Sequence, residues 1–278
     1  MGDFADIAFI GGGNMARSLI GARLRAGADP ATLHVAEPDA GTRARLAADF
    51  GVSVSARGVD AVTTADLVVL AVKPQVLRDV CLELAGALAA RRPLVVSIAA
   101  GIRSEAIDGW LGGAFPIVRC MPNTPALIGA GASALHANAR VDADARAAAE
   151  ALLASAGRTA WIDDESLMDV VTALSGSGPA YFFLLIEALE DAAVAEGLPR
   201  ETARMLAVQT ALGAARMASE DGEAPARLRE RVTSPGGTTQ AALDAFARGG
   251  LRALVADAVA AATARGRELS ARFGADAP

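Results

Sequence analysis

The stretch Arg231–Gln240 reads Arg-Val-Thr-Ser-Pro-Gly-Gly-Thr-Thr-Gln, a composition suited to binding an anion. Its proline fixes one φ angle, and its two glycines give the backbone a freedom that no other residue has. A helical pattern follows at once over residues 241–247, and we expect Thr238 or Thr239 to cap that helix. Because the first N–H groups of a helix have no partner within it, this corner is suited to hold a carboxylate. An ordinary helix–helix turn is the alternative interpretation, since Pro-Gly-Gly is common in turns.

A second glycine-rich turn, Gly11–Ala16, has the pattern G-x-G-x-x-A. A buried-strand pattern over Asp6–Ile10 precedes it, and an apolar helical pattern follows it through Leu24. Strand, glycine turn and helix in this order form the dinucleotide fingerprint, in which the backbone approaches a pyrophosphate at the helix N-terminus. We therefore predict a dinucleotide site at this turn.

Three further apolar runs, Leu67–Val72, Leu94–Ile98 and Ile117–Met121, predict buried strands, and two short strands are expected at 130–136 and 158–162. Helical patterns alternate with them, which predicts a Rossmann-type doubly wound α/β sheet in the N-terminal region. Ligands bind beyond the carboxyl ends of such strands. The cofactor-binding candidates at these ends are Gly11, Gly12, Gly13, Ala71, Val72, Lys73, Pro74, Ala99, Ala100 and Asn123.

Glu37 follows the second predicted strand, Thr32–Ala36, where this fold places an acid for the adenosine ribose. Its carboxylate would repel a 2′-phosphate, and Arg43 and Arg45 on the next helix could partly offset that repulsion. The alternative is that Glu37 belongs only to a polar helix-start turn. The sequence leaves both interpretations open.

The pattern changes near Asp163, after which no strand-like run appears. We expect a dinucleotide-binding domain over residues 1–163 and an all-helical domain over 164–278. One predicted helix begins at Pro179 and is apolar on every side over residues 180–186. A helix apolar all round must be buried all round, and a second copy of the chain is the economical cover, so we expect a homodimer.

Composition limits the classes of partner. The chain has 278 residues, 53% of them hydrophobic, and a net charge of −6 without a basic run. This balance argues against nucleic acid and anionic membranes as main partners. The longest apolar stretches, such as Leu67–Val72 and Leu94–Ile102, are too short to span a bilayer, and Met1–Phe4 lacks the basic start of a signal peptide. We therefore expect a cytoplasmic protein.

Nucleophiles and metal ligands are scarce. The chain has two histidines and two cysteines, and Lys73 is its one lysine. A Ser/His/Asp triad has almost no raw material, and no metal site is expected. We expect Cys81, Cys120 and His136 to be structural.

With these segments together, the chain resembles the pyrroline-5-carboxylate reductase family over nearly its whole length. The segments that carry the resemblance are Ile10–Met15, Ala71–Pro74, Met121–Ala126, Leu174–Tyr181 and, most specifically, Val232–Thr239. The resemblance implies an N-terminal dinucleotide-binding domain and a C-terminal helical dimerisation domain, whose dimers often assemble into larger rings. It adds Ile10, Asn14 and Met15 to the expected cofactor contacts, beside Glu37.

The family reduces L-1-pyrroline-5-carboxylate, a cyclic imine bearing a carboxylate, to L-proline with NADPH or NADH, the last step of proline biosynthesis. An imine nitrogen protonated in water needs no strong enzymatic acid. The resemblance implies that Gly237 and Thr238 hold the carboxylate and that the hydroxyl of Thr239, the catalytic candidate, contacts the ring nitrogen. The substrate-binding candidates are Ser177, Ser234, Gly236, Gly237, Thr238 and Thr239. Members that favour NADPH often carry a small hydroxyl residue where this chain has Glu37, so the choice between NADPH and NADH stays open.

Two other functions compete with this one. β-Hydroxyacid dehydrogenases also join a dinucleotide domain to helices, but they need a lysine early in the second domain, and this chain has none after Lys73. A non-catalytic NAD(P)-binding protein is the alternative from another class. The Pro-Gly-Gly-Thr-Thr corner argues against it, because a sensor needs no carboxylate site.

Overall fold

The computed structural model describes residues 4–220 and 222–274, so the start of the Met1–Phe4 segment discussed above lies outside the described residues. The chain divides into two compact units. We call residues 1–177 together with 261–278 the sheet unit, and residues 178–260 the helical unit. Each is described by itself.

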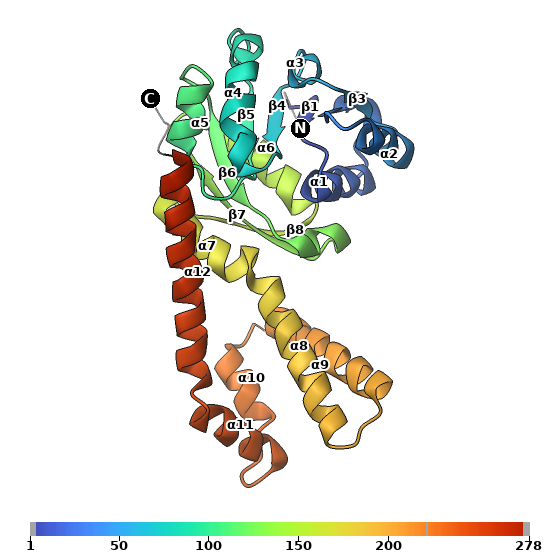
Figure 1. Ribbon diagram of the computed structural model, residues 1–278, viewed down its shortest axis with the longest axis vertical. Helices are drawn as coiled ribbons and strands as arrows, with labels where there is room; N and C mark the ends of the chain where they lie inside the picture. The colour runs from blue at the N-terminus through green and yellow to red at the C-terminus, as the bar shows by residue number, and fades with distance from the viewer. Residues whose placement is uncertain (1–3, 221, 275–278) are drawn as a thin grey trace. The chain divides into compact units, whose positions relative to one another are not determined.

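The sheet unit contains one eight-stranded sheet with the order β3-β2-β1-β4-β5-β6-β7-β8 (Figure 1). Its strands are β1 (Ile7–Ile10), β2 (Leu33–Ala36), β3 (Ser53–Ser55), β4 (Leu67–Leu70), β5 (Leu94–Ser97), β6 (Ile117–Met121), β7 (Gly131–Ala137) and β8 (Gly157–Trp161). The pairs from β3 to β6 are parallel, β7 runs antiparallel to β6, and β8 is parallel to β7. The predicted doubly wound sheet is confirmed, and the two short strands expected at 130–136 and 158–162 are β7 and β8. The antiparallel direction of β7 was not predicted.

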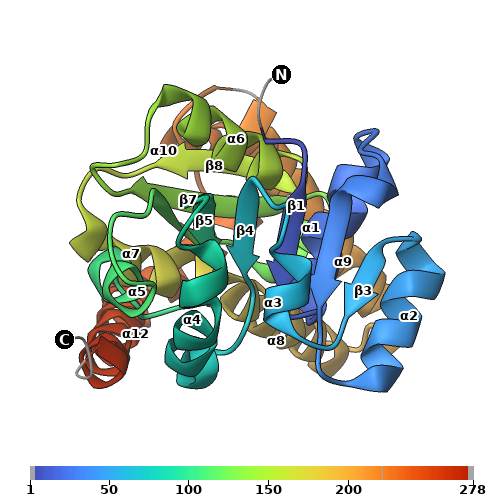
Figure 2. The same ribbon diagram turned by 90° about the horizontal axis from the view of Figure 1, so that it is seen from above.

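Helices cover both faces of this sheet, as Figure 2 shows for α4 and α6 on opposite sides of the strands. The helices of the unit are α1 (Asn14–Arg25), α2 (Ala40–Phe50), α3 (Gly58–Ala61), α4 (Pro74–Leu88), α5 (Ser104–Trp110), α6 (Ala143–Ala154) and α7 (Met168–Val171), followed by a π-helical turn, Thr172–Gly176. Short 3₁₀ turns span Pro30–Thr32, Thr124–Ile128 and Glu165–Leu167.

The core follows from the alternation of side chains along each strand. In β1, Ile7 and Phe9 pack into the cluster that contains residues of α1, α2 and α6. Ala8 and Ile10 face the opposite cluster, with residues of α3, α4 and α5. Both faces are therefore buried, which is why these strands are apolar without interruption.

The helical unit contains α8 (Gly178–Ala195), α9 (Arg200–Glu220), α10 (Pro225–Arg231), α11 (Thr238–Arg248) and the start of α12 (Leu251–Gly274), whose residues from Ala261 onward belong to the sheet unit. Glu190 of α8 is buried and accepts hydrogen bonds from Arg200 and Arg204 of α9, which ties the two helices together. Most of α8 is otherwise uncovered in the single chain: Phe182 is 64% exposed and Phe183 66%.

The helical stretch Glu165–Ala195 is long and apolar enough to cross a membrane by length and composition, and 11% of its most apolar window is buried. Among the described residues, one helix, this one, meets these criteria of length and composition. The expectation that no apolar stretch is long enough rested on shorter stretches such as Leu67–Val72 and Leu94–Ile102, whereas this helix is 31 residues long and reaches a mean hydropathy of 1.3 in its most apolar window. One helix of this kind is weak evidence for a membrane span.

Candidate active site

The carboxyl ends of β1, β2, β4, β5 and β6 lie along one edge of the parallel sheet. This edge brings together the cofactor-binding candidates Ile10, Gly11, Gly12, Gly13, Asn14, Met15, Glu37, Ala71, Val72, Lys73, Pro74, Ala99, Ala100 and Asn123. Ser177 closes the sheet unit, whereas Ser234, Gly236, Gly237, Thr238 and Thr239 belong to the helical unit.

Gly11 stands where the chain order reverses, since β1 pairs with β2 on one side and β4 on the other. Its φ is +101°, and a Cβ built on it would lie 2.7 Å from the carbonyl oxygen of Ala71. Its N–H donates to the carbonyl of Ala36 over 2.8 Å. Only glycine fits this backbone angle and this close approach. Gly11 therefore lies at the switch point of the sheet, beyond the carboxyl ends of the strands, where doubly wound folds bind their ligands.

The N-terminus of α1 has the features of an anion site. Gly13 is its N-cap, with no side-chain cap and no acidic residue in the first turn of the helix. A Cβ on Gly13 would meet nothing within 4 Å, so there is free space beside this glycine. A twelve-residue helix whose first amides have no side-chain cap fits the pyrophosphate of a dinucleotide.

Glu37 turns its carboxylate toward the glycine turn. One oxygen accepts the N–H of Gly12 at 2.9 Å and the other accepts the N–H of Asp39 at 3.0 Å. The cap of α2 is a different residue, Asp39, which accepts the N–H of Thr42 at 2.7 Å. Arg43 donates to the backbone carbonyl of Glu37, so the carboxylate itself is left facing the turn.

Lys73 and Pro74 open α4 as its N-cap and first residue, with the Lys73 side chain exposed. The Ala99–Gly101 loop follows β5 and turns at Gly101, whose φ is +78°. Ala99 donates its N–H to the hydroxyl of Ser97 at 3.4 Å. The Ala71–Pro74 loop lies against Gly11, and the Ala99–Gly101 loop follows the next strand of the sheet, β5.

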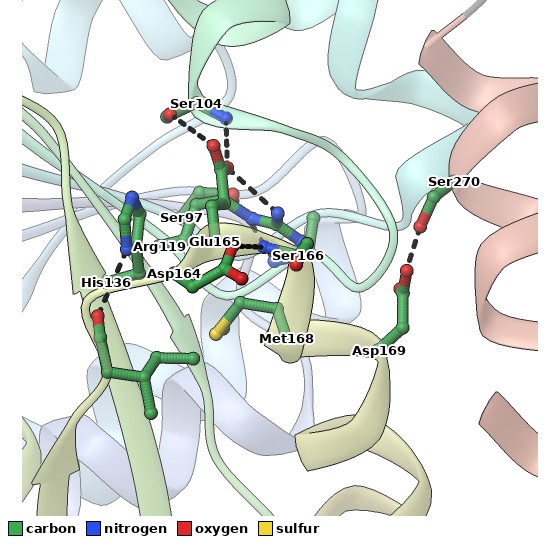
Figure 3. Close-up of polar contacts among 12 residues, drawn as sticks. Ser97, Ser104, Arg119, His136, Asp164, Glu165, Ser166, Met168, Asp169 and Ser270 are labelled. Carbon is green, nitrogen blue, oxygen red and sulfur yellow. Dashed lines mark hydrogen bonds and ion pairs between the residues drawn. The ribbon is translucent and has the colours of Figure 1, made fainter.

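A buried ion pair braces the loop after β5. Arg119 of β6, 6% exposed at its side chain, donates to Glu165 at 2.9 Å, and Glu165 also accepts the N–H and hydroxyl of Ser104 at 2.7 and 3.0 Å (Figure 3). Burial works to raise the pKa of Glu165, but the Ser104 amide and the Arg119 guanidinium outweigh it and hold that pKa below its ordinary value. No motif in the sequence predicted this cluster. An arginine inside the apolar strand Ile117–Met121 was the available signal, because a buried charge needs a partner.

Asn123 follows β6 and points into the protein. Its amide nitrogen donates to the carbonyl of Ser175 at 3.0 Å, and its side-chain oxygen accepts the N–H of Ala132 at 2.9 Å. The side chain is therefore occupied by two main-chain segments. It joins the edge of the sheet to the π-helical turn that precedes Ser177.

The Pro-Gly-Gly-Thr-Thr corner opens α11, but the expectation that Thr238 or Thr239 caps this helix is wrong. The N-cap is Gly237, with no side-chain cap. The reason is the turn before it: Gly236 has a φ of +72°, and Gly237 donates its N–H to the carbonyl of Ser234 at 3.0 Å. Both threonines are consequently the first residues of the helix, and their hydroxyls are not used as caps.

The cysteines and His136 have structural surroundings. Burial raises the pKa of Cys81 to about 12 and raises that of Cys120 as well, so neither is a thiolate nucleophile near neutral pH. The Nδ1 atom of His136 lies 3.1 Å from the carbonyl oxygen of Ile162.

Comparison with known proteins decides the family. The chain is 52% identical over 268 residues to the pyrroline-5-carboxylate reductase of Pseudomonas aeruginosa, a match that covers 96% of this chain and 98% of the relative. It belongs to the pyrroline-5-carboxylate reductase family. The resemblance inferred from the sequence motifs is thereby confirmed.

Other comparisons agree with membership in the pyrroline-5-carboxylate reductase family. Residues 165–269 match the family model for pyrroline-5-carboxylate reductase dimerisation, and residues 6–101 match that for NADP oxidoreductase, coenzyme F420-dependent. The structure of the Coxiella burnetii reductase superposes with a TM-score of 0.92 at 43% identity, covering 96% of this chain and 98% of that one. The Plasmodium falciparum reductase, solved with NADP bound, gives 0.84 at 28% identity over 96% and 99%. The dimerisation model identifies the protein as a homo-oligomer.

Proposed function

We infer that this chain catalyses the reduction of L-1-pyrroline-5-carboxylate to L-proline, the final step of proline biosynthesis. It is an NAD(P)H-dependent oxidoreductase acting on a CH–NH bond, and its cofactor is NADPH or NADH. The observation that carries this conclusion is the full-length match to the family, which includes the glycine turn of the sheet unit and the Pro-Gly-Gly-Thr-Thr corner.

We propose that the switch-point edge of the sheet unit holds the cofactor. The open N-terminus of α1, at Gly13 and Asn14, would bind the pyrophosphate. The carboxylate of Glu37, already directed at Gly12, would accept hydrogen bonds from the adenosine ribose. The loops at Ala71–Pro74 and Ala99–Ala100 would border the nicotinamide end, with the Arg119–Glu165 pair fixing the second loop through Ser104. When bound, the cofactor supplies a hydride to the imine carbon.

We propose that the corner at the start of α11 holds the substrate. The first amides of α11 have no cap, so Gly237 and Thr238 can offer N–H groups to the substrate carboxylate. The hydroxyl of Thr239, at the second position of the helix, would hydrogen-bond the ring nitrogen. The other substrate-binding candidates are Ser177, Ser234 and Gly236. These contacts fix the orientation of the imine, and positioning of two reactants is worth up to about 7–11 kcal/mol.

We propose a homodimer at minimum, formed by the helical domain, and possible assembly into a ring of dimers. The functional boundary would fall near Asp163, since β8 ends at Trp161 and the dimerisation model begins at residue 165. The exposed apolar side chains of α8, Phe182 and Phe183 among them, support burial by a second copy. Sedimentation at micromolar concentration should give a dimer or larger species, and a monodisperse monomer would contradict the proposal.

The exposed apolar side chains of α8 also bear on where in the cell the protein is found. We propose that the protein is cytoplasmic and binds neither membrane nor nucleic acid, since a subunit interface accounts for the apolar helix Glu165–Ala195. The net charge of −6 disfavours anionic surfaces. Fractionation of the expressed protein, with recovery in the membrane pellet as the contrary result, tests this.

The decisive experiment mixes purified protein with NADPH or NADH and L-1-pyrroline-5-carboxylate and follows nicotinamide absorbance. We expect oxidation of the cofactor with formation of proline. Oxidation of the cofactor with an added 3-oxo acid, but not with L-1-pyrroline-5-carboxylate, would favour the β-hydroxyacid dehydrogenase alternative. Cofactor binding without turnover of any imine would favour a non-catalytic NAD(P)-binding protein.

A further inference from the structure

The π-helical turn Thr172–Gly176 interrupts the helical stretch before α8. Ser177 donates its N–H to the carbonyl of Thr172 at 2.8 Å, a bond that spans five residues instead of four. Such a widened turn is rare and often marks a functional site. Within this turn the carbonyl of Ser175 would meet the backbone nitrogen of residue 179 in an α-helix, but residue 179 is proline and has no N–H, so this carbonyl needs a partner from elsewhere.

Asn123 supplies that partner. Its side-chain nitrogen donates to the carbonyl of Ser175 at 3.0 Å, and its oxygen is fixed by the N–H of Ala132 at 2.9 Å. The residue is 9% exposed, so its amide has little competition from water. Because both the nitrogen and the oxygen of its side-chain amide are hydrogen-bonded, the buried Asn123 forms a rigid link between β6 and the turn.

Met121 completes the contact from the same strand end. A Cβ on Gly176 would lie 2.5 Å from the Cε atom of Met121, so the thioether packs directly on the glycine backbone. The residues on either side of Pro122 therefore hold two consecutive residues of the turn. This contact joins the Met121–Ala126 and Leu174–Tyr181 segments.

We propose that Asn123 is a positioning residue, which sets Ser177 for the substrate by holding the carbonyl of Ser175 in the π-helical turn. This role rests on the proposed function, because Ser177 is a substrate-binding candidate there. It differs from the expectation that the Asn123 side chain binds the cofactor. A displaced turn moves Ser177 relative to the imine, and small misplacements in such sites reduce turnover strongly.

Asn123→Asp tests the proposal, since it keeps the acceptor for Ala132 and replaces the donor to Ser175 with an acceptor. We expect kcat/KM for L-1-pyrroline-5-carboxylate to fall by about tenfold or more, while the Kd of NADPH from nicotinamide fluorescence changes by less than about twofold. Asn138→Asp is the matched control. Asn138 bridges the other end of β6 in the same way, donating to Phe115 and accepting from Ile117, and this change should leave both quantities near wild type.

Hydrogen exchange supplies a readout that does not depend on turnover. Exchange at the peptide covering residues 172–178 should quicken in Asn123→Asp and stay unchanged in Asn138→Asp. Unchanged exchange, an equal loss of NADPH affinity, or an equal loss of kcat/KM in Asn138→Asp would each overturn the proposal. If Asn123→Asp does not fold, Gly176→Ala disturbs the same turn through Met121 and should give the same pattern, and a normal kcat/KM would overturn it. If the wild type does not reduce the imine, the proposed function fails while the exchange comparison still decides whether Asn123 holds the turn.

Discussion

Two glycine turns precede two helices in this protein. They differ in how closely other residues of the same chain pack around them. At Gly11 the backbone is pressed against Ala71, and α1 behind it buries six residues. At Gly236 a Cβ would meet nothing within 4 Å, and α11 behind it has no buried residue. The turn at Gly11 is packed against other residues of the sheet unit. The second is a helix start still exposed in a single chain.

The same contrast holds for the units that carry these turns. The sheet unit has two continuous clusters of buried apolar side chains, one on each face of the sheet. In the helical unit, α8 buries only Gly178 and Glu190, and its aromatic side chains remain exposed. The sheet unit, which is proposed to bind the cofactor, buries its own apolar side chains, whereas the helical unit leaves those of α8 exposed, and we propose that self-association covers them. The predictions below test this contrast, beginning with the largest effect.

Gly11→Ala should destabilise the protein by about 3 kcal/mol, because the side chain meets the Ala71 carbonyl at an unsuitable positive φ. Gly236→Ala, also at positive φ but in open space, should cost only about 1 kcal/mol. Urea unfolding at one fixed protein concentration measures both. Equal losses would mean that the two turns are equally constrained.

Glu165→Gln should lower the free energy of unfolding by about 2 kcal/mol at pH 7, because Arg119 is left buried with a weaker partner. Glu190→Gln should cost less, since its partners Arg200 and Arg204 are 56% and 67% exposed. The comparison fails if Glu190→Gln proves the more damaging change in urea unfolding.

The pH dependence of these two carboxylates has a definite sign. Hydrogen bonds and charge from Arg204 and Arg200 hold the pKa of Glu190 below its ordinary value. The contacts with Ser104 and Arg119 do the same for the pKa of Glu165. Each therefore stabilises the fold fully above the unfolded pKa of 4.5, and the contribution is lost as the pH falls through the folded pKa. The stability gap between wild type and each glutamine variant should narrow below about pH 4.5. A gap that widens in acid would contradict this assignment.

Thr239→Val should lower kcat by about tenfold or more, equivalent to about 1.4 kcal/mol, because the proposed hydrogen bond to the ring nitrogen changes as hydride arrives. The Kd of NADPH should be unchanged, since the cofactor candidates lie in the sheet unit. Gly237 rather than Thr239 caps α11, so the melting curve should also match the wild type. A folded variant with wild-type kcat would show that the hydroxyl has no chemical role.

Glu37→Ser should shift the ratio of kcat/KM toward NADPH by about 1 kcal/mol, as a carboxylate that repels the 2′-phosphate is removed. Asp39→Asn serves as the control, because it removes the charge of a nearby carboxylate that caps α2. An unchanged ratio in Glu37→Ser, or an equal shift in Asp39→Asn, would show that Glu37 does not read the ribose.

Local patterns predicted the long elements well and the short ones poorly. The strand before Gly11 and the helix after it were evident because apolar spacing and glycine punctuation occur together there. β3 has three residues, Ser53–Ser55, on an edge of the sheet, and its pattern is too short to be read. The direction of β7 depends on its pairing with β6, which no local pattern contains.

The doubly wound sheet could be predicted from the amino-acid sequence, because glycine turns and apolar periodicity are local properties of the chain, and the motif segments were enough to predict the family. Only the tertiary structure decided which residue caps α11, that Glu165 neutralises Arg119, and that Asn123 turns inward to Ser175. The last two depend on hydrogen bonds between residues 46 and 52 positions apart. The role of a polar side chain depends on its hydrogen-bond partner, and that partner is fixed only when distant segments of the chain pack together.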